Sequence, residues 1–210
     1  MYLTLVPPKV VGQKEEQMNV IEGHSVSLLC DVQAYPPPDI IWTKDGETLQ
    51  FSTGIHILPG GQMLQIPRAR VENAGQYVCT ASNRAGEDQK SILLSVYVPP
   101  TLKPRTESEP DIVTPQVGSF VSLRCEAEGV PEPEITWYRN GLQLAPGNGL
   151  RVDRHLLEIQ GVQVADSGIY TCKVSNIAGQ VDRTFRLTVH VPPVLNEPLE
   201  ETLVQAMGSH

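Results

Sequence analysis

Apolar and polar residues alternate with a period of two in several short segments of this chain. Residues 25–30 read Ser-Val-Ser-Leu-Leu-Cys, and residues 120–125 read Phe-Val-Ser-Leu-Arg-Cys. Similar alternation marks residues 92–96 and 185–189. A period of two places one face of a strand in a core and the other face in water. No segment has an apolar stripe with helical spacing, so the pattern predicts an all-β protein.

The pattern repeats once along the chain, with a period of slightly more than ninety residues. Matching residues mark the repeat: Cys30 and Cys125, Trp42 and Trp137, Tyr77 and Tyr170, Cys79 and Cys172. The first two pairs are 95 positions apart and the last two are 93 apart. A domain of this size buries its own core, so the repeat predicts two domains.

Val-Pro-Pro ends each unit, at 98–100 and at 191–193, and an earlier copy stands at 6–8. The predicted organisation follows from these positions: 1–8 as the last strand of a preceding domain or a linker, 9–98 as the first domain, 99–191 as the second, and 192–210 as a linker and the truncated start of a third. The closing Ala-Met-Gly-Ser-His also fits a cloning remnant, and the sequence leaves that alternative open.

The spacing of the cysteines and aromatic residues resembles that of the immunoglobulin fold. Each unit has a Trp twelve residues after its first Cys and a Tyr two residues before its second. The two cysteines are 49 residues apart in the first unit and 47 in the second, which resembles the intermediate, or I-set, type. The resemblance covers nearly the whole chain. It implies two tandem immunoglobulin-like Greek-key β-sandwiches.

The resemblance also assigns roles to the residues that carry it. It implies that a disulfide bridges the two sheets of each unit, that a Trp packs on the sulfurs and that a Tyr hydroxyl caps a corner loop: Cys30–Cys79, Trp42 and Tyr77 in the first unit, and Cys125–Cys172, Trp137 and Tyr170 in the second. With every cysteine assigned to a disulfide, the resemblance favours an oxidising compartment.

The resemblance further implies an ion pair in the second unit, because family members often pair an Arg and an Asp across the bottom of the sandwich. The residues at those positions are Arg151 and Asp166, and the matching residues of the first unit are His56 and Asn73. We therefore expect acid to destabilise the second unit through Asp166 more than it destabilises the first through this position. The alternative is that Arg151 and Asp166 are merely solvated neighbours.

The sequence contains no pattern that indicates catalysis, a cofactor or a metal. The five histidines stand apart, and no Gly-rich phosphate loop or Gly-x-Ser-x-Gly motif occurs. The glutamates at 126, 128, 132 and 134 fit a solvated acidic edge better than a calcium site. The net charge of −8 and the lack of a Lys/Arg cluster argue against nucleic acid as a partner, and no apolar run is long enough to enter a membrane.

Within the immunoglobulin superfamily, the Val-Pro-Pro joints and the Ser-Asn-x-Ala-Gly hairpin are similar to those of hemicentin-type extracellular arrays. The resemblance implies a non-catalytic binding and spacer module of an extracellular matrix or cell-adhesion protein. Its partners would be other proteins, either identical copies or matrix components. Two alternatives stay open: an intracellular cytoskeletal or muscle array with reduced cysteines, and an accessory segment of a matrix enzyme such as peroxidasin.

Overall fold

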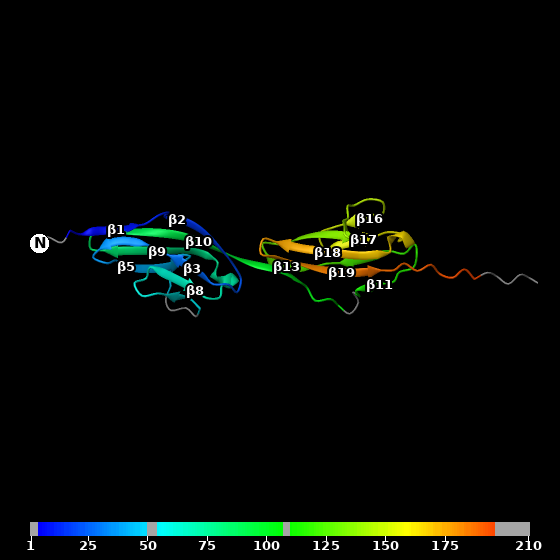
Figure 1. Ribbon diagram of the computed structural model, residues 1–210, viewed down its shortest axis with the longest axis horizontal. Coiled ribbons are helices and arrows are strands. Elements are labelled where there is room, and N and C mark those ends of the chain that lie inside the picture. The colour runs from blue at the N-terminus through cyan, green and yellow to red at the C-terminus, as the bar shows by residue number, and fades with distance from the viewer. Residues whose placement is uncertain (1–3, 50–53, 107–109, 196–210) are drawn as a thin grey trace, which may run out of the picture.

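A computed structural model describes residues 4–49, 54–106 and 110–195, which form two β-sandwiches that follow each other along one long axis (Figure 1). Its regular elements are strands and two short 3-10 helices. The predicted all-β class is confirmed. Two of the turns between strands, at Asp45-Gly46 and Asn140-Gly141, have the positive φ angles of tight hairpins.

The larger sheet of the first sandwich is built around its last two long strands. In spatial order it contains β6 (Glu47–Thr48), β5 (Asp39–Lys44), β9 (Gly75–Asn83), β10 (Gly86–Leu102) and, parallel to β10, β2 (Glu15–Ile21). The opposite layer contains β3 (Val26–Leu29), β8 (Met63–Ile66) and β7 (His56–Ile57), with β1 (Val6–Val10) paired to β4 (Val32–Tyr35). The helix η1 (Val71–Asn73) precedes β9.

The second sandwich repeats this arrangement. Its larger sheet contains β15 (Leu142–Gln143), β14 (Glu134–Arg139), β18 (Gly168–Asn176), β19 (Gly179–Leu187) and β11 (Ile112–Val113). The opposite layer contains β12 (Val121–Arg124), β17 (Leu156–Ile159) and β16 (Leu150–Val152), and β13 (Ala127–Val130) pairs with the end of β10. The helix η2 (Val164–Asp166) precedes β18.

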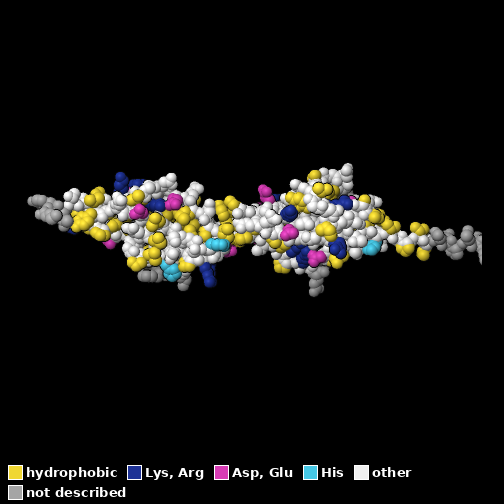
Figure 2. Space-filling model, in the orientation of Figure 1, with side chains coloured by type: hydrophobic (Ala, Val, Ile, Leu, Met, Phe, Trp, Pro, Cys, Tyr) yellow, Lys and Arg dark blue, Asp and Glu magenta, His cyan; other side chains and the backbone are white. Residues whose placement is uncertain are grey.

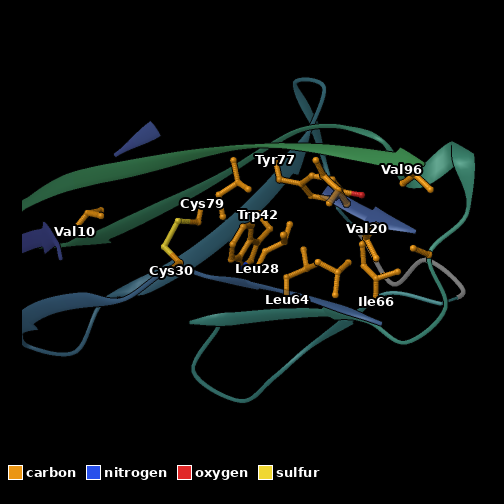
Figure 3. Close-up of a cluster of buried hydrophobic side chains, with 14 of the residues drawn as sticks. Val10, Val20, Leu28, Cys30, Trp42, Leu64, Ile66, Tyr77, Cys79 and Val96 are labelled. Atoms are coloured by element: carbon orange, nitrogen blue, oxygen red, sulfur yellow. A yellow bond between two sulfur atoms is a disulfide. The ribbon is translucent and has the colours of Figure 1, made fainter. Parts of the chain in front are cut away.

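Each sandwich has its own core, formed by the inward faces of its two sheets. Strand β9 shows the alternation: Tyr77, Cys79 and Ala81 are fully buried, whereas the residues between them are partly exposed. The corresponding residues of β18 are buried in the same way. Figure 3 shows Trp42 beside the disulfide in the first core. The period of two in the sequence thus reports which side of each strand faces the other sheet.

Candidate functional site

One disulfide and one tryptophan occupy the centre of each core. The structure joins Cys30 to Cys79 and Cys125 to Cys172, the two pairs that the family resemblance implies, with Cα atoms 6.4 and 6.5 Å apart. Trp42 and Trp137 are 1% exposed. All six side chains are therefore packing residues that hold the two sheets of each sandwich together.

The two tryptophans differ in how their indole nitrogens are satisfied. Trp42 Nε1 donates a hydrogen bond to the carbonyl of Gly61, 2.7 Å away. Trp137 Nε1 is buried, and among the described residues no acceptor lies within reach. Gly61 lies in a loop that is two residues longer in the first sandwich than in the second. The longer loop thus brings a carbonyl to the indole in the first core, whereas the shorter loop at 153–155 of the second sandwich places no acceptor within reach of Trp137 Nε1.

Tyr77 and Tyr170 close a corner at the start of their strands. Each hydroxyl donates to a backbone carbonyl four residues earlier, of Asn73 and of Asp166, at 2.7 Å. Burial and the nearby Asp45 carboxylate raise the pKa of Tyr77 to about 12. Burial also raises the pKa of Tyr170. Both phenols therefore stay protonated at neutral pH and can keep donating to the corner.

The prediction of an ion pair between Arg151 and Asp166 is wrong. Arg151 lies directly opposite Glu158 on the neighbouring strand, and its Nη1 is 3.4 Å from Glu158 Oε2. Asp166 faces Arg139 of β14 instead, with Oδ1 3.7 Å from Nη1. The cross-strand neighbour is the nearest anion for Arg151, because directly opposed side chains lie on the same face of a sheet.

The carboxylate of Asp166 also has a local role that does not require a charge. Its Oδ2 accepts the backbone N–H of Gln163 at 2.8 Å, ahead of η2. In the first sandwich Asn73 accepts the N–H of Arg70 at 2.7 Å in the same way. An amide oxygen and a carboxylate oxygen serve equally as this acceptor. The change from Asp to Asn between the repeats therefore keeps this hydrogen bond and removes only the partly exposed pairing with Arg139.

The two sandwiches share one strand, β10. Its first part lies between β2 and β9 of the first sandwich, and its end pairs with β13 of the second. The register shifts between Val98 and Thr101, where Pro99 and Pro100 have no N–H to donate. Figure 1 shows this strand passing from one sandwich to the next. Because the joint is a paired strand rather than a free linker, it restricts rotation of one sandwich against the other.

A single side-chain amide fastens this strand to the second sandwich. Asn176 Nδ2 donates to the carbonyls of Val98, at 2.8 Å, and of Pro131, at 2.9 Å. Its Oδ1 accepts the N–H groups of Ala178, at 2.9 Å, and Gly179, at 3.2 Å. Both ends of the amide are thus engaged, one by the strand that enters the sandwich and one by the hairpin that precedes β19.

The joint also depends on close approach of the backbone at two glycines. A Cβ added to Gly179 would lie 3.3 Å from Pro99 Cβ. A Cβ added to Gly129 would lie 3.2 Å from the carbonyl oxygen of Val98 and 3.1 Å from Asn176 Nδ2. These separations are tighter than ordinary van der Waals contact, so any larger residue would push the entering strand away.

The N-terminal end of the first sandwich repeats the joint. Asn83 Nδ2 donates to the carbonyls of Val6, at 2.9 Å, and Pro36, at 3.1 Å. A Cβ added to Gly86 would lie 3.2 Å from Pro7 Cβ. The Val-Pro-Pro at 6–8 is therefore held by the first sandwich as the one at 98–100 is held by the second. The sequence marked both asparagines through their turn motif, and their hold on the entering strand is visible only in the structure.

Two acidic side chains tie the first strands of the first sandwich to β10. Asp88 accepts from Lys14 Nζ at 2.7 Å and from the N–H of Val10 at 2.8 Å. Lys90 Nζ lies 2.7 Å from Glu16 Oε2 and has an exposed fraction of 10% in its side chain. The hydrogen bonds from Lys14 and Val10 hold the pKa of the Asp88 carboxyl below its usual range. These contacts fix the crossing from β1 to β2.

We expect acid to weaken the first sandwich through Asp88. Because the folded-state pKa is lowered, the stabilisation is present above the unfolded pKa of about 3.9 and is lost as pH falls through the folded value. The matching residue of the second sandwich is Val181. Asp88→Asn should lower the stability of the first sandwich by roughly 1 kcal/mol at pH 7 and by clearly less at pH 2, as measured by denaturant unfolding. An equal loss at the two pH values would contradict this role.

Charged side chains of the described residues form no metal site, and several of them lie in ion pairs. Among residues 4–49, 54–106 and 110–195, no group of three His, Cys, Asp or Glu side chains could hold a metal ion. Glu126 and Glu132, from the acidic stretch of the sequence, lie beside Lys103 and Arg154. Figure 2 shows acidic and basic side chains interspersed over the visible face of the second sandwich. The described part of the chain has no helix long and apolar enough to cross a membrane.

Both sandwiches match the model of one known family. The model of the immunoglobulin I-set domain matches residues 8–96 and 104–189. The chain belongs to the immunoglobulin I-set family. This confirms the resemblance inferred from the Cys, Trp and Tyr spacing, including the I-set type.

The chain is similar to segments of much longer proteins. Human Hemicentin-1 is 40% identical over 206 residues, which cover 97% of this chain and 4% of that protein. Human Peroxidasin homolog is 35% identical over 176 residues, which cover 83% of this chain and 12% of that protein. The chain therefore corresponds to a small part of each relative, and the likeness to hemicentin agrees with the resemblance drawn from the sequence.

Solved structures with tandem immunoglobulin domains have the same fold. Immunoglobulin domains 1–4 of Sidekick-1 match with a TM-score of 0.74 at 27% identity, covering 89% of this chain and 49% of that one. The I-band fragment I67–I69 of titin matches with a TM-score of 0.67 at 27% identity, covering 90% of this chain and 68% of that one. Sidekick-1 and titin domains thus share the architecture with this chain, so the fold alone does not decide between the candidate functions.

Proposed function

We propose that this segment is a non-catalytic protein-binding and spacer module of an extracellular multidomain protein. The observation that carries the proposal is the shared strand β10, which leads from one sandwich into the other with its far end fastened by Asn176. A paired strand holds two modules at a set distance, and arrays of such modules present many binding surfaces at once. Other proteins are the proposed partners.

The extracellular location is supported by chemistry as well as by the likeness to hemicentin. All four cysteines are in disulfides, and disulfides persist in oxidising compartments. The domain organisation that we propose is 1–8 as the end of a preceding unit or a linker, 9–98 and 99–191 as the two domains, and 192–210 as a linker and the start of a third. Residues 1–3 and 196–210 of that scheme lie outside the described residues.

Solution scattering combined with thiol counting tests this proposal on native protein. A spacer predicts an elongated particle, in which the two sandwiches are separated along one axis, and no thiol that reacts before reduction. A compact, folded-back particle would contradict the spacer role. Four reactive thiols in protein purified from its natural source would favour the intracellular alternative. An accessory role in an enzyme such as peroxidasin predicts the same results as the proposal, and the full-length sequence distinguishes it.

A further inference from the structure

The tripeptide Asn-Gly-Leu occurs twice in the second sandwich, at 140–142 and at 148–150. In both copies the Asn-Gly pair forms an exposed two-residue turn between residues that are paired in antiparallel register. The φ angles at Asn and Gly are 47° and 82° in the first turn and 49° and 79° in the second. The two turns thus share their sequence and nearly the same φ angles, so only their surroundings can make them react differently.

The side chain of Asn140 is anchored, whereas that of Asn148 is not. Asn140 Oδ1 accepts the backbone N–H of Ile169 at 2.9 Å, and the Asn140 N–H donates to the Ile169 carbonyl at 2.8 Å. The first sandwich has the same anchor, because Asp45 Oδ1 accepts the N–H of Gln76 at 2.9 Å. Within the described part of the chain, the Asn148 amide has no hydrogen-bond partner. Its side chain is therefore free to rotate.

We propose that Asn148 is a site of spontaneous deamidation and that its anchor protects Asn140 from the same reaction. The Gly149 nitrogen attacks Asn148 Cγ, the Cγ–Nδ2 bond breaks, and ammonia leaves with the proton that the Gly149 nitrogen gives up. Water then opens the succinimide ring at either carbonyl, which leaves aspartate or isoaspartate at position 148. Glycine favours the attack because it has no side chain to hinder its nitrogen. The proposal does not rest on the proposed binding function.

The anchor opposes this reaction because ring closure brings the side-chain carbon onto the nitrogen of the next residue. Asn140 must first give up its hydrogen bond to Ile169 and move away from Gly168, where an added Cβ would lie 2.9 Å from Asn140 Oδ1. At the second turn, Gly149 is held through its carbonyl, which accepts the N–H of Gln160 at 2.9 Å, and this leaves its nitrogen available. A hydrogen bond of ordinary strength slows a reaction that must break it by roughly ten-fold.

Isoaspartate at position 148 should disturb the start of β16. It lengthens the main chain by one carbon, because the chain then runs through Cβ and Cγ. The turn is closed by mutual backbone hydrogen bonds of 2.9 Å between Gly147 and Leu150, and Leu150 packs against the second core. Among the described strands, β16 pairs with β17 alone, and Figure 1 shows the loop before β16 projecting from the second sandwich. We therefore expect the isoaspartate form of the second sandwich to unfold at lower denaturant.

The test is incubation of the native two-sandwich chain at neutral pH and body temperature for several weeks. Peptide mapping by mass spectrometry follows both asparagines, and methylation by an isoaspartyl methyltransferase identifies isoaspartate. We expect Asn148 to deamidate roughly ten-fold faster than Asn140. The matched control is the same chain reduced and unfolded in denaturant, where neither asparagine is anchored and the two identical tripeptides should react at similar rates.

The effect on β16 is measured on the isoaspartate form after separation by charge. Its denaturant titration, followed by Trp137 fluorescence, is compared with that of freshly prepared Asn148→Asp, which adds the charge without the extra carbon. The isoaspartate form should unfold at lower denaturant than Asn148→Asp. Equal midpoints would contradict the predicted disturbance of the turn.

Three results would overturn the assignment of Asn148 as the reactive site. The first is an equal or faster reaction at Asn140 in the folded chain. The second is an Asn148 that stays intact in the folded chain while it reacts in the unfolded one, because its turn would then be protected without an anchor. The third is the same difference in rate in denaturant, because the preceding residue and not the anchor would then set the two rates.

Discussion

Replacing Cys125 and Cys172 together by alanine should lower the free energy of unfolding of the second sandwich by about 4 kcal/mol. The disulfide closes a loop of 47 residues and so removes much of the chain entropy of the unfolded state. The change also removes sulfur atoms that are fully buried in the core beside the tryptophan. Since small domains are stable by about 5–15 kcal/mol, this loss is a large share of the total.

Each sandwich contains one of the two tryptophans, which makes the loss measurable in the intact chain. In a denaturant titration of the variant, the change in Trp137 fluorescence should occur at lower denaturant than the change in Trp42 fluorescence. The mirror variant, with Cys30 and Cys79 replaced by alanine, should reverse the order, because its loop of 49 residues is nearly the same length. A joint transition that moves equally in either variant would show instead that the two sandwiches unfold as one unit.

The residues that the sequence predicted well are those whose roles depend on one local geometry. A cysteine pair, a tryptophan twelve residues on and a tyrosine before the second cysteine each fill a fixed place between two sheets. The alternation of apolar residues fixes which side of each strand is buried, and Val26, Leu28 and Cys30 are buried as it predicts. Packing of this kind leaves few alternatives, so the spacing could be matched to the immunoglobulin fold, and that resemblance implied the role of each residue.

The ion pair failed because exposed charges have several partners within reach. Arg151 is 71% exposed in its side chain and could swing toward any nearby carboxylate. The register of β16 against β17 places Glu158 directly opposite Arg151. The spacing of the sequence repeat does not reveal that register. The described carboxyl groups with a lowered pKa, Asp45 and Asp88, both lie in the first sandwich. The partners of Asp88, Lys14 and Val10, are more than seventy residues away in sequence.

The contacts of the joint between the two sandwiches could be predicted only in part from the sequence, for a related reason. Val-Pro-Pro marked the boundary between the two units, but a proline pattern does not say what the connection packs against. The structure shows that an asparagine in the last hairpin of each sandwich holds the carbonyl of the entering valine. This contact joins segments about eighty residues apart, and only the assembled fold brings them together.

Asn176→Ala should loosen the joint between the two sandwiches. The substitution leaves the carbonyls of Val98 and Pro131 without their side-chain donor and the hairpin N–H of Ala178 without its acceptor. These groups are partly exposed, so water takes over some of the lost hydrogen bonds and the cost in stability should be about 1–2 kcal/mol. The pairing of β10 with β13 remains, and the strand can then hinge about the two prolines.

Asn83→Ala is the matched control because it removes the same contacts from the first sandwich. Asn83 holds Val6 and Pro36, so its loss should cost similar stability without touching the connection between the two sandwiches. Residual dipolar couplings of backbone amides report the orientation of each sandwich separately. The two alignment tensors should coincide in the native chain and in Asn83→Ala, and should diverge in Asn176→Ala. If Asn176→Ala keeps one common tensor, β-pairing and the prolines hold the joint without the asparagine. If both variants diverge, the joint responds to general loss of stability and not to the contact with Val98.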